Sequence, residues 1–114
     1  MAQYEVLKPW GKEDVIEVNE QYMFKRLEMH AGHQCSLQRH HNKKETFYLL
    51  SGEMELIIED ATGTLVPIQI KPGQSYTINP MVKHRMRAIT NIVYFECSTP
   101  HPDDVKRLQD DYQR

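Results

Sequence analysis

Side chains able to do chemistry gather in one polar stretch, residues 32–45. It holds three of the six histidines in the 114-residue chain. Gln38 and His40 are two residues apart, so on an extended strand their side chains share one face. Glu45 follows shortly after. An amide oxygen, an imidazole and a carboxylate together suit a divalent first-row metal ion. The stretch therefore predicts three metal ligands.

Glu45 needs a change of direction to reach that face, because it lies an odd number of residues beyond His40. Polar turn-forming residues at 41–44 allow a bend that returns Glu45 on the next strand. The residues that share its face there, Phe47 and Leu49, are apolar, as an interior requires. His84 follows the loop at 79–83 and begins another strand. We expect it to supply a second imidazole.

Short apolar runs separated by turn residues recur along the chain, which is typical of a sandwich or barrel. Pro67 confines its strand to a sheet edge or a bulge. The strands are predicted at residues 22–29, 34–40, 45–50, 53–59, 65–70, 75–78, 84–88 and 92–97. This pattern predicts an all-β jelly roll formed as one domain over residues 1–114.

Only the last part of the chain, residues 103–112, shows the spacing of a helix. Its apolar residues recur every three or four positions, and an aspartate precedes them as a candidate N-cap. The residues are Asp103 or Asp104 as the cap, then Val105, Leu108 and Tyr112. We predict a short C-terminal helix that docks on the barrel.

Composition excludes several classes of protein. Fourteen Lys and Arg against 16 Asp and Glu give a net charge of −2, which argues against a nucleic-acid partner. No apolar run is long enough to span a membrane, and the first residues lack the features of a secretory signal. These observations predict a cytoplasmic protein.

Cys35 and Cys97 match no zinc or redox spacing, so both are predicted to be buried thiols.

The spacing Gly32-x5-Gln38-x-His40-x4-Glu45-x6-Gly52 resembles the first motif of the cupin superfamily, with Gln38 in place of the usual first histidine. Residues 72–85 resemble the second cupin motif. The chain is most similar to the cupin domain of type II mannose-6-phosphate isomerases, which is often fused to mannose-1-phosphate guanylyltransferases. Pro9-Trp10-Gly11 and residues 103–112 extend the similarity over nearly the whole chain. It implies a double-stranded β-helix.

The resemblance also implies an activity and a metal shell. It points to a sugar-phosphate isomerase that converts mannose 6-phosphate, or a related sugar, to its ketose. The shell would hold one divalent ion, with Zn, Mn, Co, Ni and Fe not distinguished. Its ligands would be Gln38, His40, Glu45 and His84.

The chain departs from the family at several positions, so the sugar need not be mannose 6-phosphate. Asn42 and Lys43 stand where the family often has histidine and arginine, and Lys lacks the bidentate geometry of Arg. Thr46-Phe47 replaces a frequent His-Trp pair, and Met81 stands where a glycine is expected.

Lys43 and Arg85 are candidate substrate-binding residues, because both can grip phosphate oxygens. Alternation turns Arg85 outward from His84, whereas the family's recurring His-Arg pair favours its involvement. The residues do not identify a catalytic base.

Two other functions stay open, a non-catalytic sugar- or metabolite-binding cupin and a non-haem iron dioxygenase. We expect a homodimer, since pairing protects free strand edges.

Overall fold

Alternation of buried and exposed side chains produces an all-β fold in this computed structural model, which describes residues 3–112. Along the strand that begins at Glu45, for example, Phe47 and Leu49 are buried while Thr46 and Tyr48 are exposed. The described residues form eleven strands: β1 (Tyr4–Lys8), β2 (Gly11–Val18), β3 (Met23–Met29), β4 (Leu37–Arg39), β5 (Glu45–Ser51), β6 (Met54–Glu59), β7 (Leu65–Ile70), β8 (Ser75–Ile78), β9 (His84–Ala88), β10 (Ile92–Ser98) and β11 (Lys106–Gln109).

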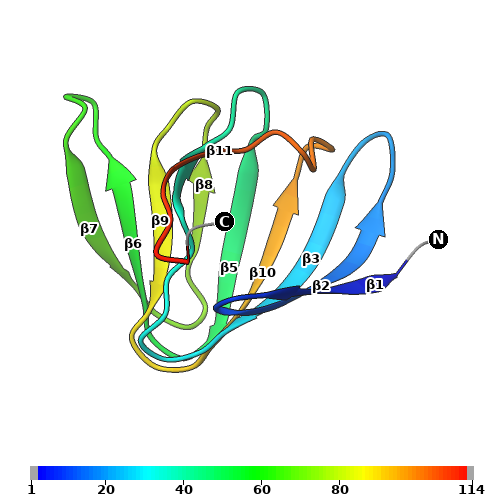
Figure 1. Ribbon diagram of the computed structural model, residues 1–114, viewed down its shortest axis with the longest axis horizontal. Helices are drawn as coiled ribbons and strands as arrows, with labels where there is room; N and C mark the ends of the chain where they lie inside the picture. Colours follow the sequence, from blue (N-terminus) through cyan, green and yellow to red (C-terminus); the bar gives the residue numbers. More distant parts are fainter. Residues whose placement is uncertain (1–2, 113–114) are drawn as a thin grey trace.

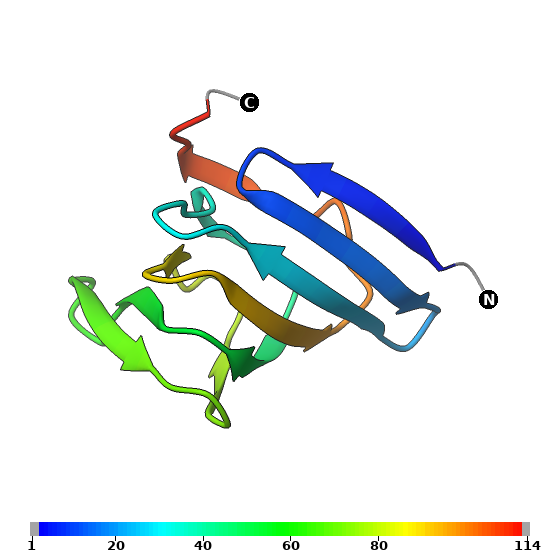
Figure 2. The same cartoon turned by 90° about the horizontal axis from the view of Figure 1, so that it is seen from below.

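The strands form two antiparallel sheets. One has the order β1-β2-β3-β10-β5-β8 and the other β11-β4-β9-β6-β7 (Figure 1). Figure 2 shows β1, β2, β3 and β10 side by side in one layer. Side chains from both sheets, such as Phe47 and Leu49 of the first and Leu56 and Met86 of the second, pack into one apolar cluster. The sheets therefore face each other across a single core, and the predicted jelly roll is confirmed.

The inner face changes from apolar to polar along the barrel. On β5 the buried residues run from Leu49 to Glu45. On the neighbouring β10, buried Tyr94 is followed by buried Glu96 and Ser98, and Ser98 pairs with Glu45. One end of the interior thus holds hydrocarbon and the other holds ionisable groups.

The predicted strands from residue 22 onward are all present, although the one expected at 34–40 is shorter, as β4. Pro67 lies on β7, which is a sheet edge as predicted. The hairpin β1–β2 was not predicted. Cys35 is buried as expected, but the expectation for Cys97 is wrong because its side chain is exposed.

The predicted C-terminal helix is wrong. Residues 106–109 form β11 instead, which pairs with β4 and runs across the barrel in Figure 1. A helix of so few residues is marginal in water, whereas pairing with the free edge of β4 satisfies backbone hydrogen-bonding groups of both strands. Of the apolar residues behind the helix prediction, Tyr112 packs against the core cluster.

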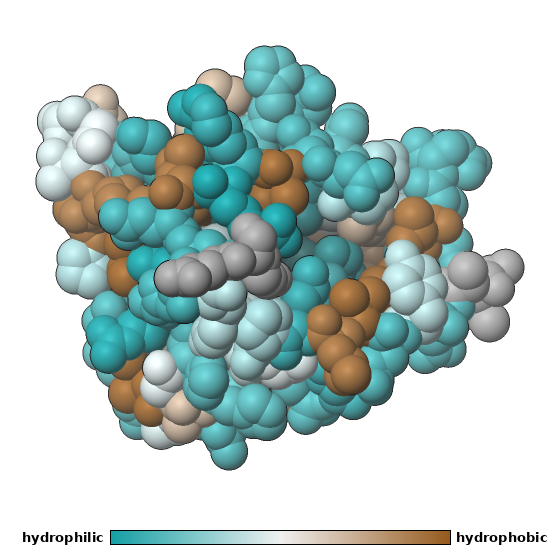
Figure 3. Space-filling model, viewed as in Figure 1, coloured by the Kyte–Doolittle hydropathy of each residue, from teal (hydrophilic) through white to brown (hydrophobic). Residues whose placement is uncertain are grey.

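The described surface is mixed in character. Two of its larger exposed apolar side chains, Tyr4 and Leu7, lie on edge strand β1. On the face seen in Figure 3, hydrophobic residues occur as separate groups among hydrophilic ones. Residues 3–112 contain no helix that could cross a membrane.

The loop between β8 and β9 contains a backbone conformation that favours glycine. Met81 has φ 70°, the only positive φ of a non-glycine residue in the described part of the chain. Its amide donates a 2.6 Å hydrogen bond to the carbonyl oxygen of His40. The resemblance expects glycine at this position, and the positive φ of Met81 is a conformation that favours glycine.

Met81→Gly should stabilise the protein. A non-glycine residue in the left-handed region destabilises the folded state by about 1–2 kcal/mol. Glycine avoids this cost, but ordering its more flexible unfolded backbone costs about 0.5–1 kcal/mol. The Met81 side chain is 45 % exposed, so little packing is lost. We expect a gain of up to about 1 kcal/mol, or a Tm higher by roughly 4 °C, in thermal unfolding. Ile89 is equally exposed without a positive φ, so Ile89→Gly should lower Tm. A lower Tm for both variants would contradict this explanation.

Candidate metal centre

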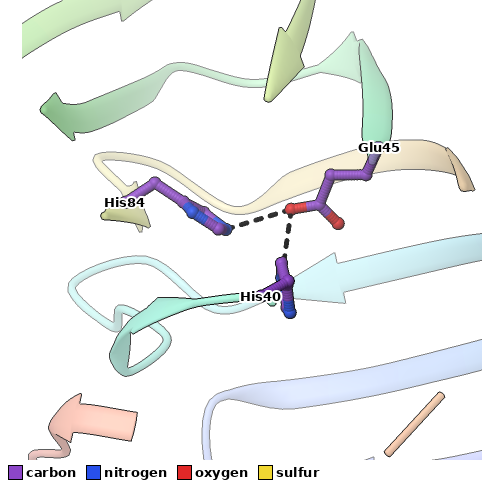
Figure 4. A group of neighbouring side chains, drawn as sticks. All are labelled: His40, Glu45 and His84. Atoms are coloured by element: carbon purple, nitrogen blue, oxygen red, sulfur yellow. Dashed lines mark ion pairs between the residues drawn. The ribbon is translucent and has the colours of Figure 1, made fainter. Parts of the chain in front are cut away.

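Three buried side chains converge at the polar end of the interior. The Nε2 atoms of His84 and His40 lie 3.0 and 3.5 Å from the same oxygen, Glu45 Oε1 (Figure 4). One ligand atom from each residue lies within 4.8 Å of the others. Ligands at about 2.0–2.2 Å from one ion would be separated by roughly 3–3.5 Å. The spacing is thus compatible with a shared cation.

Each side chain reaches this point from a different element. Glu45 and His84 are the first residues of β5 and β9, and His40 directly follows β4. The bend predicted at residues 41–44 is present between β4 and β5. It places Glu45 on the inner face that His40 also occupies.

Backbone carbonyls set the tautomer of both imidazoles. His40 Nδ1 lies 2.6 Å from the carbonyl oxygen of Asp104, and His84 Nδ1 lies 3.0 Å from that of Val82. A carbonyl can only accept, so each Nδ1 carries the proton and donates it. In the neutral rings this leaves the Nε2 lone pairs directed at Glu45, the arrangement in which histidine binds metals.

The polar atoms at the centre lack hydrogen-bond partners. His40 Nε2, His84 Nε2 and both carboxylate oxygens of Glu45 are buried without one. Leaving such a group unpaired costs about 1–3 kcal/mol. A divalent cation would satisfy all of these acceptors at once, so the donor set fits a metal ion.

The surrounding charges keep Glu45 ionised. Burial alone would raise its pKa, but the neighbouring Glu96 carboxyl and the charge of Lys43 act in the opposite direction, and the pKa of Glu45 lies well below its ordinary value. Burial and then the charge of Glu45 raise the pKa of Glu96 to about 8. Glu45 is therefore the anion of this pair, and Glu96 is the neutral acid. Glu96 was missed at the sequence level, although a glutamate within the apolar run 92–97 is a usable signal.

Lys43 extends into this buried region, with Nζ 3.4 Å from Glu45 Oε2 and 3.9 Å from Glu96 Oε1. Burial lowers its pKa, but the nearby carboxyl groups outweigh that effect and the net pKa is raised. The ammonium therefore remains charged beside the candidate metal ligands.

The other two predicted site residues lie on opposite faces of their sheet. Gln38 pairs with His84 across β4 and β9, accepts a hydrogen bond from Ser36 Oγ and lines the same cavity as His40. Arg85 is buried elsewhere. Its Nε donates to the carbonyl oxygen of Cys35 at 3.0 Å, and Nη2 lies 3.6 Å from Asp111. Arg85 thus fastens the C-terminal segment and does not line the cavities beside the three converging side chains.

Asp104 holds the bend that carries the candidate ligands. Its carboxylate accepts hydrogen bonds from the amides of His41, Asn42 and Lys43 at 2.9, 2.6 and 2.9 Å. Its carbonyl oxygen orients His40. The aspartate predicted to cap a helix therefore caps this loop. One residue of the C-terminal segment fixes both the backbone after β4 and the ring of His40.

Two facing sheets with an inner His/Glu/His cluster at one end define a cupin. The chain belongs to the family described as "Mannose-6-phosphate isomerase C-terminal", whose model matches residues 1–110.

Among curated relatives, the chain is 35 % identical over 80 residues to mannose-1-phosphate guanylyltransferase 2 of Escherichia coli O157:H7, covering 67 % of this chain and 17 % of that protein. It is 30 % identical over 115 residues to mannose-1-phosphate guanylyltransferase ManC of Salmonella typhimurium, covering 96 % and 23 %. The chain thus spans about a fifth of the length of these relatives.

The fold is also found in solved structures. Oxalate decarboxylase from Bacillus subtilis, in a structure at pH 4.6, superposes with a TM-score of 0.82 at 15 % identity, over 93 % of this chain and 30 % of that one. Another structure of that decarboxylase is described with Mn(II) centres. At this identity the likeness establishes the cupin fold alone.

Asp104→Ala removes the carboxylate that caps residues 41–43 but keeps the carbonyl oxygen that orients His40. It should therefore weaken metal binding by about 10-fold, the lower end of the range for loss of a supporting group. The measurement is calorimetric titration of the metal-free variant with Zn²⁺ or Co²⁺. Asp60→Ala is a matched control, because Asp60 Oδ1 also accepts amide hydrogen bonds, from Thr62 and Thr64, in a distant turn. It should lower stability without changing metal affinity. Equal affinities for both variants and the wild type would contradict the assigned role.

Asp104 should also make stability depend on pH. Hydrogen bonds from the amides of Asn42 and then His41 are the main causes that lower its pKa to about 2, from an ordinary value of 3.8. A depressed carboxyl pKa stabilises the folded state fully above the unfolded value. That contribution is lost as the pH falls from about 4 towards 2. Asp104→Asn should therefore reduce the fall in Tm between about pH 4 and pH 2. The same fall in Tm in the variant and the wild type would contradict the stabilising role of these hydrogen bonds.

Proposed function

We propose that this chain is a metal-dependent aldose–ketose isomerase of sugar phosphates, with mannose 6-phosphate and fructose 6-phosphate as the first pair to test. The observation that carries the proposal is the set of buried acceptors without hydrogen-bond partners on His40, Glu45 and His84. Membership of the mannose-6-phosphate isomerase C-terminal family supports the reaction class. The curated relatives named above are guanylyltransferases, so the isomerase step rests on the family description and on the site.

The proposed shell comprises Gln38, His40, Glu45 and His84 around one divalent ion. Gln38 joins the three convergent residues because it lies opposite His84 and lines the cavity with His40. When bound, such an ion polarises a carbonyl and stabilises negative charge on its oxygen. Isomerisation needs this, because a proton moves between adjacent carbons while charge develops on oxygen.

The chain's own residues would position the sugar. The cavity beside His40 has a volume of about 290 Å³, which exceeds the space of a few water molecules. Lys43 is charged, buried and close to Glu45, so its ammonium can donate hydrogen bonds to sugar oxygens near the ion. Arg85 is not included in this proposal, because it contacts the C-terminal segment instead.

Elemental analysis tests the metal shell. The wild type should carry about one divalent ion per chain, and His84→Ala and the near-isosteric Glu45→Gln should each lose it. His41→Ala is the matched control, because His41 adjoins His40 but is exposed, and it should retain the ion. Metal loss should also lower Tm, since a ligand that binds only the folded state stabilises it. Equal metal content in all four proteins would refute the proposed metal ligands.

Turnover tests the reaction. Metal-loaded wild type should convert mannose 6-phosphate to fructose 6-phosphate, whereas Glu45→Gln should not. Tight binding of the sugar without turnover, in protein that carries its metal, would favour a non-catalytic cupin. Oxygen uptake by iron-loaded protein would favour a dioxygenase.

Self-association is a separate proposal. Strand β1 lies at the edge of the six-stranded sheet and carries Leu7, which is 77 % exposed. Pairing of such edges in a homodimer would cover both the backbone groups and this side chain. Light scattering should give twice the chain mass of 13.5 kDa, and particles of the single-chain mass alone would refute the dimer.

A further inference from the structure

A second group of polar side chains adjoins the candidate metal ligands inside the barrel. A smaller cavity of about 70 Å³ shares Gln38, Lys43 and Arg107 with the larger cavity beside His40. Its wall also includes Trp10 and Tyr94. Because the two cavities share these residues, they form adjoining parts of one interior space. A ligand that reaches the metal centre could extend into both.

The wall of this space holds an unsatisfied donor. Trp10 is only 3 % exposed and lines the smaller cavity, and its indole Nε1 has no hydrogen-bond partner among the described residues. An indole N–H can only donate. Buried tryptophans usually find an acceptor for it, so the cavity lacks an acceptor at this point.

The position of Trp10 is enforced by the backbone. Gly11 begins β2 with φ 156°, and a Cβ there would lie 2.0 Å from the carbonyl oxygen of Glu28. Only glycine permits this close approach of β2 to β3. The turn that carries Trp10 is therefore pressed against the barrel, and the indole is held in the wall.

Cationic side chains from three elements surround the same space. Lys8 of β1, Lys25 of β3 and Arg107 of β11 line both cavities. Lys8 and Lys25 share one carboxylate, Glu13, at 3.6 and 3.1 Å. Two ammonium groups beside a single carboxylate retain unused donors and a net positive charge.

Arg107 is the cation best placed to engage a ligand. Its side chain is exposed, and no hydrogen bond or ion pair of it is found within residues 3–112, unlike Lys8, Lys25 and Lys43. Its strand, β11, pairs with β4 beside Gln38, so the guanidinium is carried to the cavity wall. Arg is the side chain suited to bidentate recognition of phosphate.

We propose that this space is a phosphate subsite, in which Arg107, Lys25, Lys8 and the indole N–H of Trp10 bind the phosphate of a ligand whose other end reaches the metal centre. A phosphate group offers acceptors in several directions, which suits donors arriving from β1, β3, β11 and the β1–β2 turn. The inference rests on the proposed function for the rest of the ligand. The subsite itself can be tested without metal.

The test uses the fluorescence of Trp10, the single tryptophan of the chain. Metal-free wild type is titrated with inorganic phosphate at constant ionic strength, and a saturable change in emission is expected. Arg107→Gln should weaken phosphate binding by about 10–100-fold, as expected for loss of a charge-assisted hydrogen bond. Arg87→Gln is the matched control, because Arg87 is half exposed and pairs with Glu55 away from the cavities. It removes the same charge and should leave the affinity unchanged.

Trp10→Phe keeps an aromatic ring but loses the N–H, and calorimetry should show weaker phosphate binding than in the wild type. His84→Ala separates the two proposals, since it should lose metal and turnover while retaining phosphate affinity. A lack of saturable binding by metal-free wild type would overturn the subsite even if metal content and turnover are normal. Equal affinities for the Arg107→Gln and Arg87→Gln proteins would do the same.

Discussion

The buried carboxylate of Glu45, facing two imidazole lone pairs, is the interaction on which the site depends. The Nδ1 atoms of His40 and His84 each donate to a backbone carbonyl, so in the neutral tautomer neither ring has a proton left to donate to Glu45. Three groups with no donor between them are thereby held at the polar end of a barrel whose opposite end is hydrocarbon. Such an arrangement is costly unless positive charge enters it, and Lys43 contacts only one of the carboxylate oxygens.

The C-terminal segment and the N-terminal hairpin of the chain both support this arrangement. The C-terminal segment supplies the carbonyl that orients His40 and the carboxylate that caps residues 41–43. The N-terminal hairpin β1–β2 widens the first sheet, and Lys8 and Trp10 from this part of the chain form a wall of the interior space. The candidate metal centre and the proposed phosphate subsite thus share one space, and Arg107 of the C-terminal segment joins residues of the N-terminal hairpin around the second.

Local patterns predicted the strands and the three convergent residues, because two-residue alternation and turn residues act over short distances. The same reasoning failed for the tail, where spacing alone cannot distinguish a helix from a strand that pairs with a distant edge. It also missed Asp104 as a loop cap, Glu96 beside Glu45, and the hairpin of residues 4–18. Each of these depends on contacts between residues far apart in the chain. For Arg85 the local pattern succeeded, because alternation predicted that its side chain points away from His84. The structure shows that it contacts Cys35 and Asp111 there.

The hydrogen bond between His40 and Asp104 joins residues 64 positions apart, and this has a consequence for biosynthesis. The first motif emerges from the ribosome well before the residue that completes it. A nascent chain stopped short of β11 would have its histidines and glutamate but no clamp on the loop between them. The three converging side chains are therefore expected to take up their final positions only after the segment around Asp104 has been synthesised.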